Sequence, residues 1–131
     1  MRIVALQKED DKLIQEAARL LVEGFQDNWP EAWPDLPAAL SEVQEALAED
    51  RICRAALDEQ GQLLGWVGAI CTYGGRVWEL HPLVVDPRHR KQGIGTKLVR
   101  DLEEQVRQRG GITIFIGSDD ENNMTSLAAV D

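Results

Sequence analysis

The chain has 131 residues, 44% of them hydrophobic and 28% charged, a composition that fits a globular protein and excludes a disordered or fibrous one. Its length predicts a single domain over residues 1–131. No apolar run approaches the roughly 20 residues of a membrane helix, residues 1–6 lack the long apolar run of a secretion signal, and two cysteines make no disulfide framework. We therefore expect a reduced, soluble, cytoplasmic protein that binds no membrane.

The net charge of −9 is unevenly distributed. Residues 1–50 carry 12 acidic and 4 basic side chains, whereas residues 51–131 carry 11 and 10. Residues 88–100 hold five bases and no acid. A nucleic-acid-binding protein would show a basic face or stripe, so we expect no nucleic acid partner. The pattern suits a site that holds a small anion on one side and a cation on the other; the alternative is that the charge serves solubility alone.

The first third of the chain predicts one strand and two helices. Residues 1–6 resemble a short strand, and residues 10–27 carry apolar side chains at helical spacing. Three prolines then interrupt the chain, because proline lacks a backbone donor; they are Pro30, Pro34 and Pro37. Residues 38–49 form a second predicted helix, whose inner side carries Leu40, Val43 and Leu47.

The remaining residues predict four strands and one helix. Strands at 52–58 and 63–73 are joined by a hairpin connection at 59–62, and a turn at 73–75 leads to an apolar strand at 77–86. A helix at 93–109 ends at two glycines and precedes a buried strand at 112–116. The order β-α-α-β-β-β-α-β predicts an α/β fold, a mixed α+β sheet with helices on its faces.

The strand at 77–86 carries two polar side chains where a plain core strand would carry none. Strand alternation places Glu79, His81 and Leu83 on one face. Trp78 and Leu80 fall on the other face. Glutamate and histidine side by side in an apolar strand are therefore candidate functional residues.

Pro82 interrupts the same strand. Proline cannot donate to a sheet ladder and within sheets belongs at edges or bulges. We therefore expect the strand to bulge or splay near Pro82. Such a splay would let the backbone of residues 83–85 bond something other than a neighbouring strand.

The segment at 92–97, QGIGTK, marks the start of the last predicted helix. Its glycines allow close backbone approach to a ligand, and a helix start favours a phosphate. The segment is not the dinucleotide fingerprint, because residue 98 is leucine, and it lacks the P-loop pattern. By itself a Gly-x-Gly pair is equally an ordinary helix start.

The residues around the two glycines make this pattern more specific. Arg90-x-x-Gly93-x-Gly95, between an apolar strand and an amphipathic helix, resembles the acetyl-CoA loop of the GNAT superfamily of N-acetyltransferases. The strand order is similar too. WELHPLVV at 78–85, GGITI at 110–114, GSDD at 117–120 and NWPE at 28–31 resemble a branch of the aminoglycoside 6'-N-acetyltransferases. The likeness covers essentially the whole chain.

The resemblance implies direct, metal-free transfer of an acetyl group from acetyl-CoA, as co-substrate, to a primary amine. The Leu83 N–H would donate to the thioester oxygen, the Val85 backbone would pair with the pantetheine arm, and loop amides would cradle the pyrophosphate. The implied cofactor-binding residues are Leu83, Val84, Val85, Arg90, Lys91, Gln92, Gly93, Ile94, Gly95 and Thr96.

The implied catalytic residues are Glu79, His81 and Leu83. Glu79 would take a proton from the substrate ammonium, because only the free amine attacks a thioester, and His81 would shape the site. The alternatives are that Glu79 pairs with an arginine and that His81 is a structural histidine.

The implied substrate is a small cationic amine, bound by acids and aromatic side chains. Asp119 and Asp120 would bind the sugar rings, and Tyr73 would line the pocket; alternatively, the two aspartates cap a helix. A flap would carry Trp29, Glu31, Trp33 and Asp35. The alternative is a turn whose indoles pack against the core.

In this family a helix and two strands follow the strand that ends before Gly117, and this arm commonly carries a tyrosine that protonates the thiolate. The chain ends at Asp131, so we expect a domain without its C-terminal arm. The sheet edge left exposed would favour pairing with a second chain as a homodimer. Two alternatives to the aminoglycoside enzyme are acetylation of a polyamine or other small amine and a non-catalytic acetyl-CoA-binding module.

Overall fold

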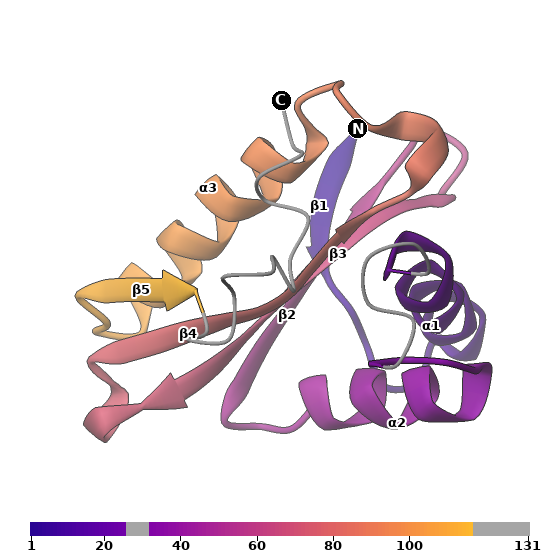
Figure 1. Ribbon diagram of the computed structural model, residues 1–131. Coiled ribbons are helices and arrows are strands. Elements are labelled where there is room, and N and C mark those ends of the chain that lie inside the picture. The colour runs from indigo at the N-terminus through magenta and orange to yellow at the C-terminus, as the bar shows by residue number, and fades with distance from the viewer. Residues whose placement is uncertain (26–31, 117–131) are drawn as a thin grey trace.

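The computed structural model describes residues 1–25 and 32–116, which form one five-stranded sheet with helices on both faces (Figure 1). The predicted order β-α-α-β-β-β-α-β is confirmed, with short 3-10 turns η1 (Tyr73–Gly75) and η2 (Pro87–His89) on either side of the fourth strand. The elements are β1 (Arg2–Ala5), α1 (Asp11–Phe25), α2 (Leu36–Ala46), β2 (Arg51–Leu57), β3 (Leu63–Thr72), β4 (Val77–Val85), α3 (Ile94–Gln108) and β5 (Thr113–Ile116).

The sheet is mixed, and each of its faces has its own apolar core. The strands lie in the order β1-β2-β3-β4-β5; all neighbours are antiparallel except β4 and β5, which α3 connects as a parallel pair. Trp66 and Val84 face α1 and α2, whereas Val67 and Val85 face α3. Figure 1 shows α1 and α2 together on one side of the twisted sheet and α3 on the other. Because apolar side chains cover both faces, β3 and β4 are anchored from two sides.

A β-bulge lies where Pro82 predicts one. Leu83 is opposite Val67 and Leu80 is opposite Ala69, so two residues of β4 face the single residue Gly68. The bulge confirms the predicted irregularity, but it also overturns the predicted facing of Leu83. The extra residue shifts the alternation by one position. Leu83 therefore packs with Trp78 and Leu80 against α3 and does not share a face with Glu79.

Helix α2 starts earlier than predicted and turns a different face inward. Asp35 is its N-cap and accepts a hydrogen bond from the Ala38 N–H at 3.0 Å. Pro37 lies in the first turn, where its missing N–H costs nothing, so it does not break the helix as expected. The fully buried residues of the helix are Ala39, Val43 and Ala46, while Leu40 and Leu47 are only partly buried.

Strand β5 is not the buried strand that the apolar run at 112–116 predicts. Ile112, just before the strand, is 74% exposed, and Phe115 is 38% exposed. Ile114 is partly buried and packs against the core under α3. In the part of the chain that the structure describes, β5 pairs with β4 alone; the exposed sheet edge that we expect stays a prediction.

Candidate active site

The backbone of β4 changes its partners halfway along. Over Val77–Leu80 it pairs with β5, and within the described ranges this parallel pairing stops at Leu80. Beyond the bulge, β4 remains paired with β3, and the Asp86 N–H donates to the Leu64 carbonyl at 2.8 Å. Because backbone groups of an antiparallel strand alternate in direction, those of Leu83 and Val85 point to the opposite edge of β4. The sequence predicts that acetyl-CoA binds at this edge.

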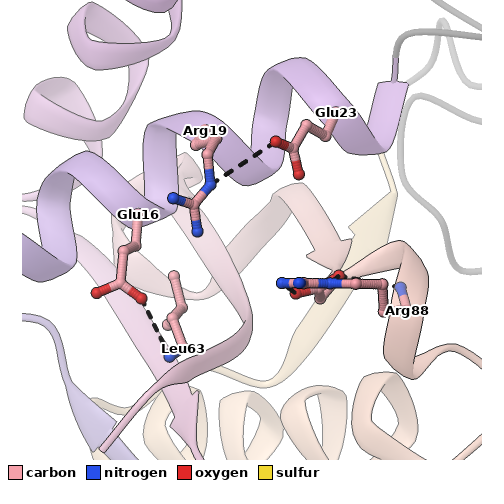
Figure 2. A network of polar contacts seen from close by, with 6 residues as sticks. Glu16, Arg19, Glu23, Leu63 and Arg88 are labelled. Carbon is pink, nitrogen blue, oxygen red and sulfur yellow. Dashed lines mark hydrogen bonds and ion pairs between the residues drawn. The ribbon is translucent and has the colours of Figure 1, made fainter.

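The turn after β4 is held by a buried carboxylate. Asp86 is 3% exposed and accepts the Arg88 backbone N–H at 2.9 Å and its guanidinium at 2.8 and 3.2 Å. Burial opposes ionisation of the Asp86 carboxyl, but the hydrogen bonds and charge of Arg88 outweigh burial and lower its pKa. Figure 2 shows Arg88 next to α1, whose Glu23 adds a favourable charge. The Arg88 charge is thus largely matched within the protein.

The Arg90 side chain also forms a hydrogen bond within the protein, which the motif does not predict. Its guanidinium donates to the Gly24 carbonyl near the end of α1 at 3.1 Å. Gly24 itself touches β4 so closely that a Cβ there would come within 2.5 Å of Val84 Cγ2. The Arg90 side chain therefore fixes the loop to α1, and the loop offers its backbone rather than this side chain to a ligand.

The loop backbone between η2 and α3 has the form of an anion site. Lys91 has φ +64° and Gly93 has φ +81°, both in the left-handed region. Left-handed residues in a turn gather successive N–H groups into a concave surface that suits a phosphate. Gly93 is the N-cap of α3 and brings no side chain, and a Cβ there would meet nothing within 4 Å. This geometry suits a phosphate group, with the positive end of the α3 dipole beneath it; binding of the coenzyme A pyrophosphate here stays a prediction.

Glu79 and His81 project from β4 toward the face that α1 and α2 cover. Trp78 and Leu80 lie in the core under α3, so the residues that alternate with them face the other way. The His81 Nε2 atom lies 3.9 Å from Glu42 Oε1, and the ring centroids of His81 and Trp33 are 6.0 Å apart. Among the described residues no basic side chain forms an ion pair with Glu79, so the arginine-pair alternative is not observed.

The predicted flap divides into described and undescribed parts. Trp33 is buried, and its ring packs edge-on against Phe25 at 5.1 Å. Asp35 caps α2. Trp33 therefore follows the alternative of a turn whose indole packs against the core, whereas Asp35 is exposed. Tyr73 belongs to η1, just before β4, and its substrate role stays a prediction. Trp29, Glu31, Asp119 and Asp120 lie outside the described residues.

Two residues that the sequence did not single out belong to the same polar cluster. Glu42 reaches down from α2, and its carboxylate is 3.9 Å from Arg51 Nη1 as well as from His81. Arg51 is in register with Ile70, and Ile70 with Glu79, so Arg51 and Glu79 share one face of the sheet. A helical pattern phased on Ala39 and Val43 would have placed Glu42 on the inner face.

The described residues form neither a cluster of metal ligands nor a membrane-spanning helix. In residues 1–25 and 32–116 no three His, Cys, Asp or Glu side chains gather as they would around a metal ion. The expectation of a metal-free reaction stays a prediction. No helix in these ranges is long and apolar enough to cross a membrane.

The acetyltransferase (GNAT) family model matches residues 15–129. A comparison with curated protein sequences gives no significant match.

Three solved structures are similar over most of the chain. An aminoglycoside 6'-N-acetyltransferase complexed with coenzyme A is 41% identical, with a TM-score of 0.79 over 89% of this chain and 61% of that one. An aminoglycoside 6'-acetyltransferase type Ii is 42% identical, with a TM-score of 0.78 over 92% and 73% of the two chains. The enzyme from Enterococcus faecium is 40% identical, with a TM-score of 0.76 over 88% and 61%. The chain thus spans about three fifths of two of these proteins.

Proposed function

Because the chain belongs to the acetyltransferase (GNAT) family, we propose that it transfers the acetyl group of acetyl-CoA to a primary amine, the 6'-amino group of an aminoglycoside. The observation that carries the proposal lies in β4. The backbone N–H and C=O groups of Leu83 and Val85 point to the edge of β4 that faces away from β3. The Glu79 side chain projects from the face of β4 that α1 and α2 cover. One strand therefore presents both a cofactor edge and a base.

Bound along that edge, acetyl-CoA supplies an acyl group already activated as a thioester. The Val85 backbone holds the pantetheine arm, and the loop from Arg90 to Thr96 holds the pyrophosphate. The Leu83 N–H donates to the thioester oxygen as negative charge develops there. Such a preorganised donor lowers a barrier by roughly 2.7–4 kcal/mol.

Glu79 acts as the general base. Aminoglycoside amines are largely protonated near neutral pH, and only the free amine has the lone pair that attacks the thioester carbon. Glu79 takes the ammonium proton, directly or through one water, and so generates the nucleophile. Support for this role comes from its position on β4 two residues before the bulge and from the absence of an ion pair with any described basic side chain.

The acid-rich first part of the chain supports a cationic acceptor. Residues 1–50 carry a balance of −8, from 12 acids and 4 bases, and this segment includes α1 and α2 on the Glu79 face. Three solved aminoglycoside acetyltransferases with an identity near 41% support an aminoglycoside in particular. Trp29, Glu31, Asp119 and Asp120 are proposed contacts for its sugar rings.

Glu79→Gln tests the proposed chemistry, with Glu103→Gln on the exposed face of α3 as a matched control. Removal of a general base costs roughly 10²–10⁴-fold in rate. We expect kcat to fall at least about 10²-fold in Glu79→Gln, with the Kd for coenzyme A unchanged by calorimetry, and Glu103→Gln to behave as the wild type. Full kcat in Glu79→Gln would remove the general base from the proposal.

We also propose that the chain forms a homodimer through the β5 edge, where Ile112 and Phe115 are exposed. An open strand edge with apolar side chains favours pairing with another chain. Light scattering after gel filtration should give the mass of two chains, and Phe115→Lys should give the mass of one. A wild-type mass of 14.6 kDa would contradict the dimer.

A further inference from the structure

Glu42 bridges two strands that are not neighbours. Its carboxylate is 3.9 Å from Arg51 Nη1 on β2 and 3.9 Å from His81 Nε2 on β4. Strand β3 lies between them, and there Gly68, which faces the bulge at His81, contributes no side chain. The Glu42 carboxylate thus lies over β3, between Arg51 and His81, on the face of the sheet that also carries Glu79.

The three side chains, Glu42, Arg51 and His81, are buried enough from solvent for their charges to interact strongly. The side chains of Arg51 and Glu42 are each 17% exposed and that of His81 is 25% exposed. Partly buried charges are screened by salt much less than charges on the open surface. Arg51 Nη1 is buried and has no hydrogen-bond partner among the described residues, so its main electrostatic partner is Glu42. Arg51 therefore holds the Glu42 carboxylate in this place.

The Glu42 carboxylate favours one position for the ring proton of His81. A neutral imidazole carries one proton, and the group that faces each ring nitrogen decides which nitrogen carries it. A carboxylate accepts hydrogen bonds and cannot donate one, so it favours the proton on Nε2, the atom that faces it. At 3.9 Å the pair exceeds direct hydrogen-bond length, so the effect acts through charge or through one bridging water.

We propose that Glu42, held by Arg51, is a positioning residue that keeps the proton of neutral His81 on Nε2 and leaves Nδ1 as a hydrogen-bond acceptor. His81 and Glu79 are two residues apart on one strand and project from the same face. An acceptor nitrogen at this point can orient the substrate amine, or the water through which Glu79 removes its proton. The kinetic part of this inference rests on the proposed acetyl transfer, whereas the state of the His81 ring does not.

Nitrogen NMR of the imidazole rings tests the proposal without any turnover. The chain has two histidines, His81 and His89, so a His89→Asn variant assigns the signals. At a pH where both rings are neutral, we expect the wild-type His81 ring to show a protonated Nε2 and an unprotonated Nδ1. A protonated Nδ1 on His81 in the wild type would overturn the proposal, whatever the Glu42 variants show.

Three variants then separate the carboxylate from the helix that bears it. Glu42→Met removes the carboxylate at similar length, Glu42→Asp keeps it, and Glu45→Met changes an exposed residue of the same helix. We expect Glu42→Met alone to shift His81 toward a mixture of tautomers and to leave the His89 signals unchanged. Unaltered His81 signals in a folded Glu42→Met variant would contradict the role of Glu42.

Kinetics of the same variants connect the ring to the reaction. We expect kcat to fall about tenfold in Glu42→Met, since an acid–base site loses part of its effect when a partner is misoriented. The KM for acetyl-CoA should stay unchanged, and Glu42→Asp should recover most of kcat. A normal kcat with altered His81 signals would overturn the link to the reaction. Inactivity of the wild type toward amines would instead count against the proposed function and leave the NMR result standing.

Discussion

Gly68 of β3 lies against the carbonyl of His81 so closely that a Cβ on Gly68 would come within 2.8 Å of that oxygen. The contact is between two backbones, at the bulge that reverses the alternation of β4. It keeps His81 on the face of α2 while Leu83 turns to the face of α3. The local geometry of the candidate site therefore depends on the absence of one side chain.

Gly68→Ala should destabilise the protein strongly, because the obstructing atom belongs to the backbone and cannot rotate away. Overpacking of this kind costs typically about 1–3 kcal/mol in the free energy of unfolding. Gly61→Ala is the control: Gly61 has φ +82° but open space around it, so it bears only the left-handed backbone strain of about 1–2 kcal/mol. Urea titration measures both. If Gly68→Ala is fully stable and retains the wild-type His81 signals, the close contact does not shape the site.

The Asp86–Arg88 pair should make the free energy of unfolding depend on pH. Because the pKa of Asp86 is lower in the folded protein than in the unfolded chain, its contribution is complete above the ordinary carboxyl pKa, about 4, and is lost as pH falls through the lower folded value. Asp86→Asn should therefore cost roughly 1–3 kcal/mol at pH 7 and progressively less in acid.

Asp35→Asn is the matched control for that series, because asparagine also caps helices and Asp35 is exposed. Chemical denaturation at several pH values between about 7 and 2 gives the two difference curves. A destabilisation by Asp86→Asn that stays constant down to the lowest pH would show that the carboxylate charge of Asp86 is not what holds the turn.

The two cysteines should differ in reactivity. Burial raises the pKa of the Cys53 thiol to about 12, against the opposing charges of Arg51 and Arg54. Only about one Cys53 in 10⁴ is then a thiolate at pH 8, and the thiolate is the reactive form. Cys71 is only partly buried. We expect an aromatic disulfide reagent to modify one thiol rapidly in the native protein, and Cys71→Ser to abolish this phase. Rapid modification of the Cys71→Ser variant would place Cys53 at the surface.

The sequence predicts the order of elements because each has a strong local signal. The bulge follows from Pro82, which lacks a ladder donor. The face on which Leu83 lies does not follow, because a bulge shifts the alternation of side chains and the sequence does not give the exact position of the bulge. Likewise, Pro37 is compatible with the first turn of a helix once Asp35 is recognised as its N-cap, a pattern that is missed when the proline is interpreted as a helix breaker.

The candidate site is less predictable than the fold because its members come from separate elements. Glu79 and His81 stand out as polar residues in an apolar strand. Glu42 does not, since an acid on a helix is ordinarily solvated and the leucines of residues 38–49 predict a different inner face. Arg90 matches the loop motif, yet its side chain bonds to Gly24, a carbonyl 66 residues away in the sequence.

The most direct test of the account is acetyl-CoA-dependent release of free thiol with kanamycin, which has a 6'-amine, and with paromomycin, which has a 6'-hydroxyl. We predict release with kanamycin and none with paromomycin, together with loss of the kanamycin reaction in Glu79→Gln. Release with neither compound would contradict acetyl transfer to an aminoglycoside by this chain. Equal release with both would contradict the 6'-amine as the acceptor.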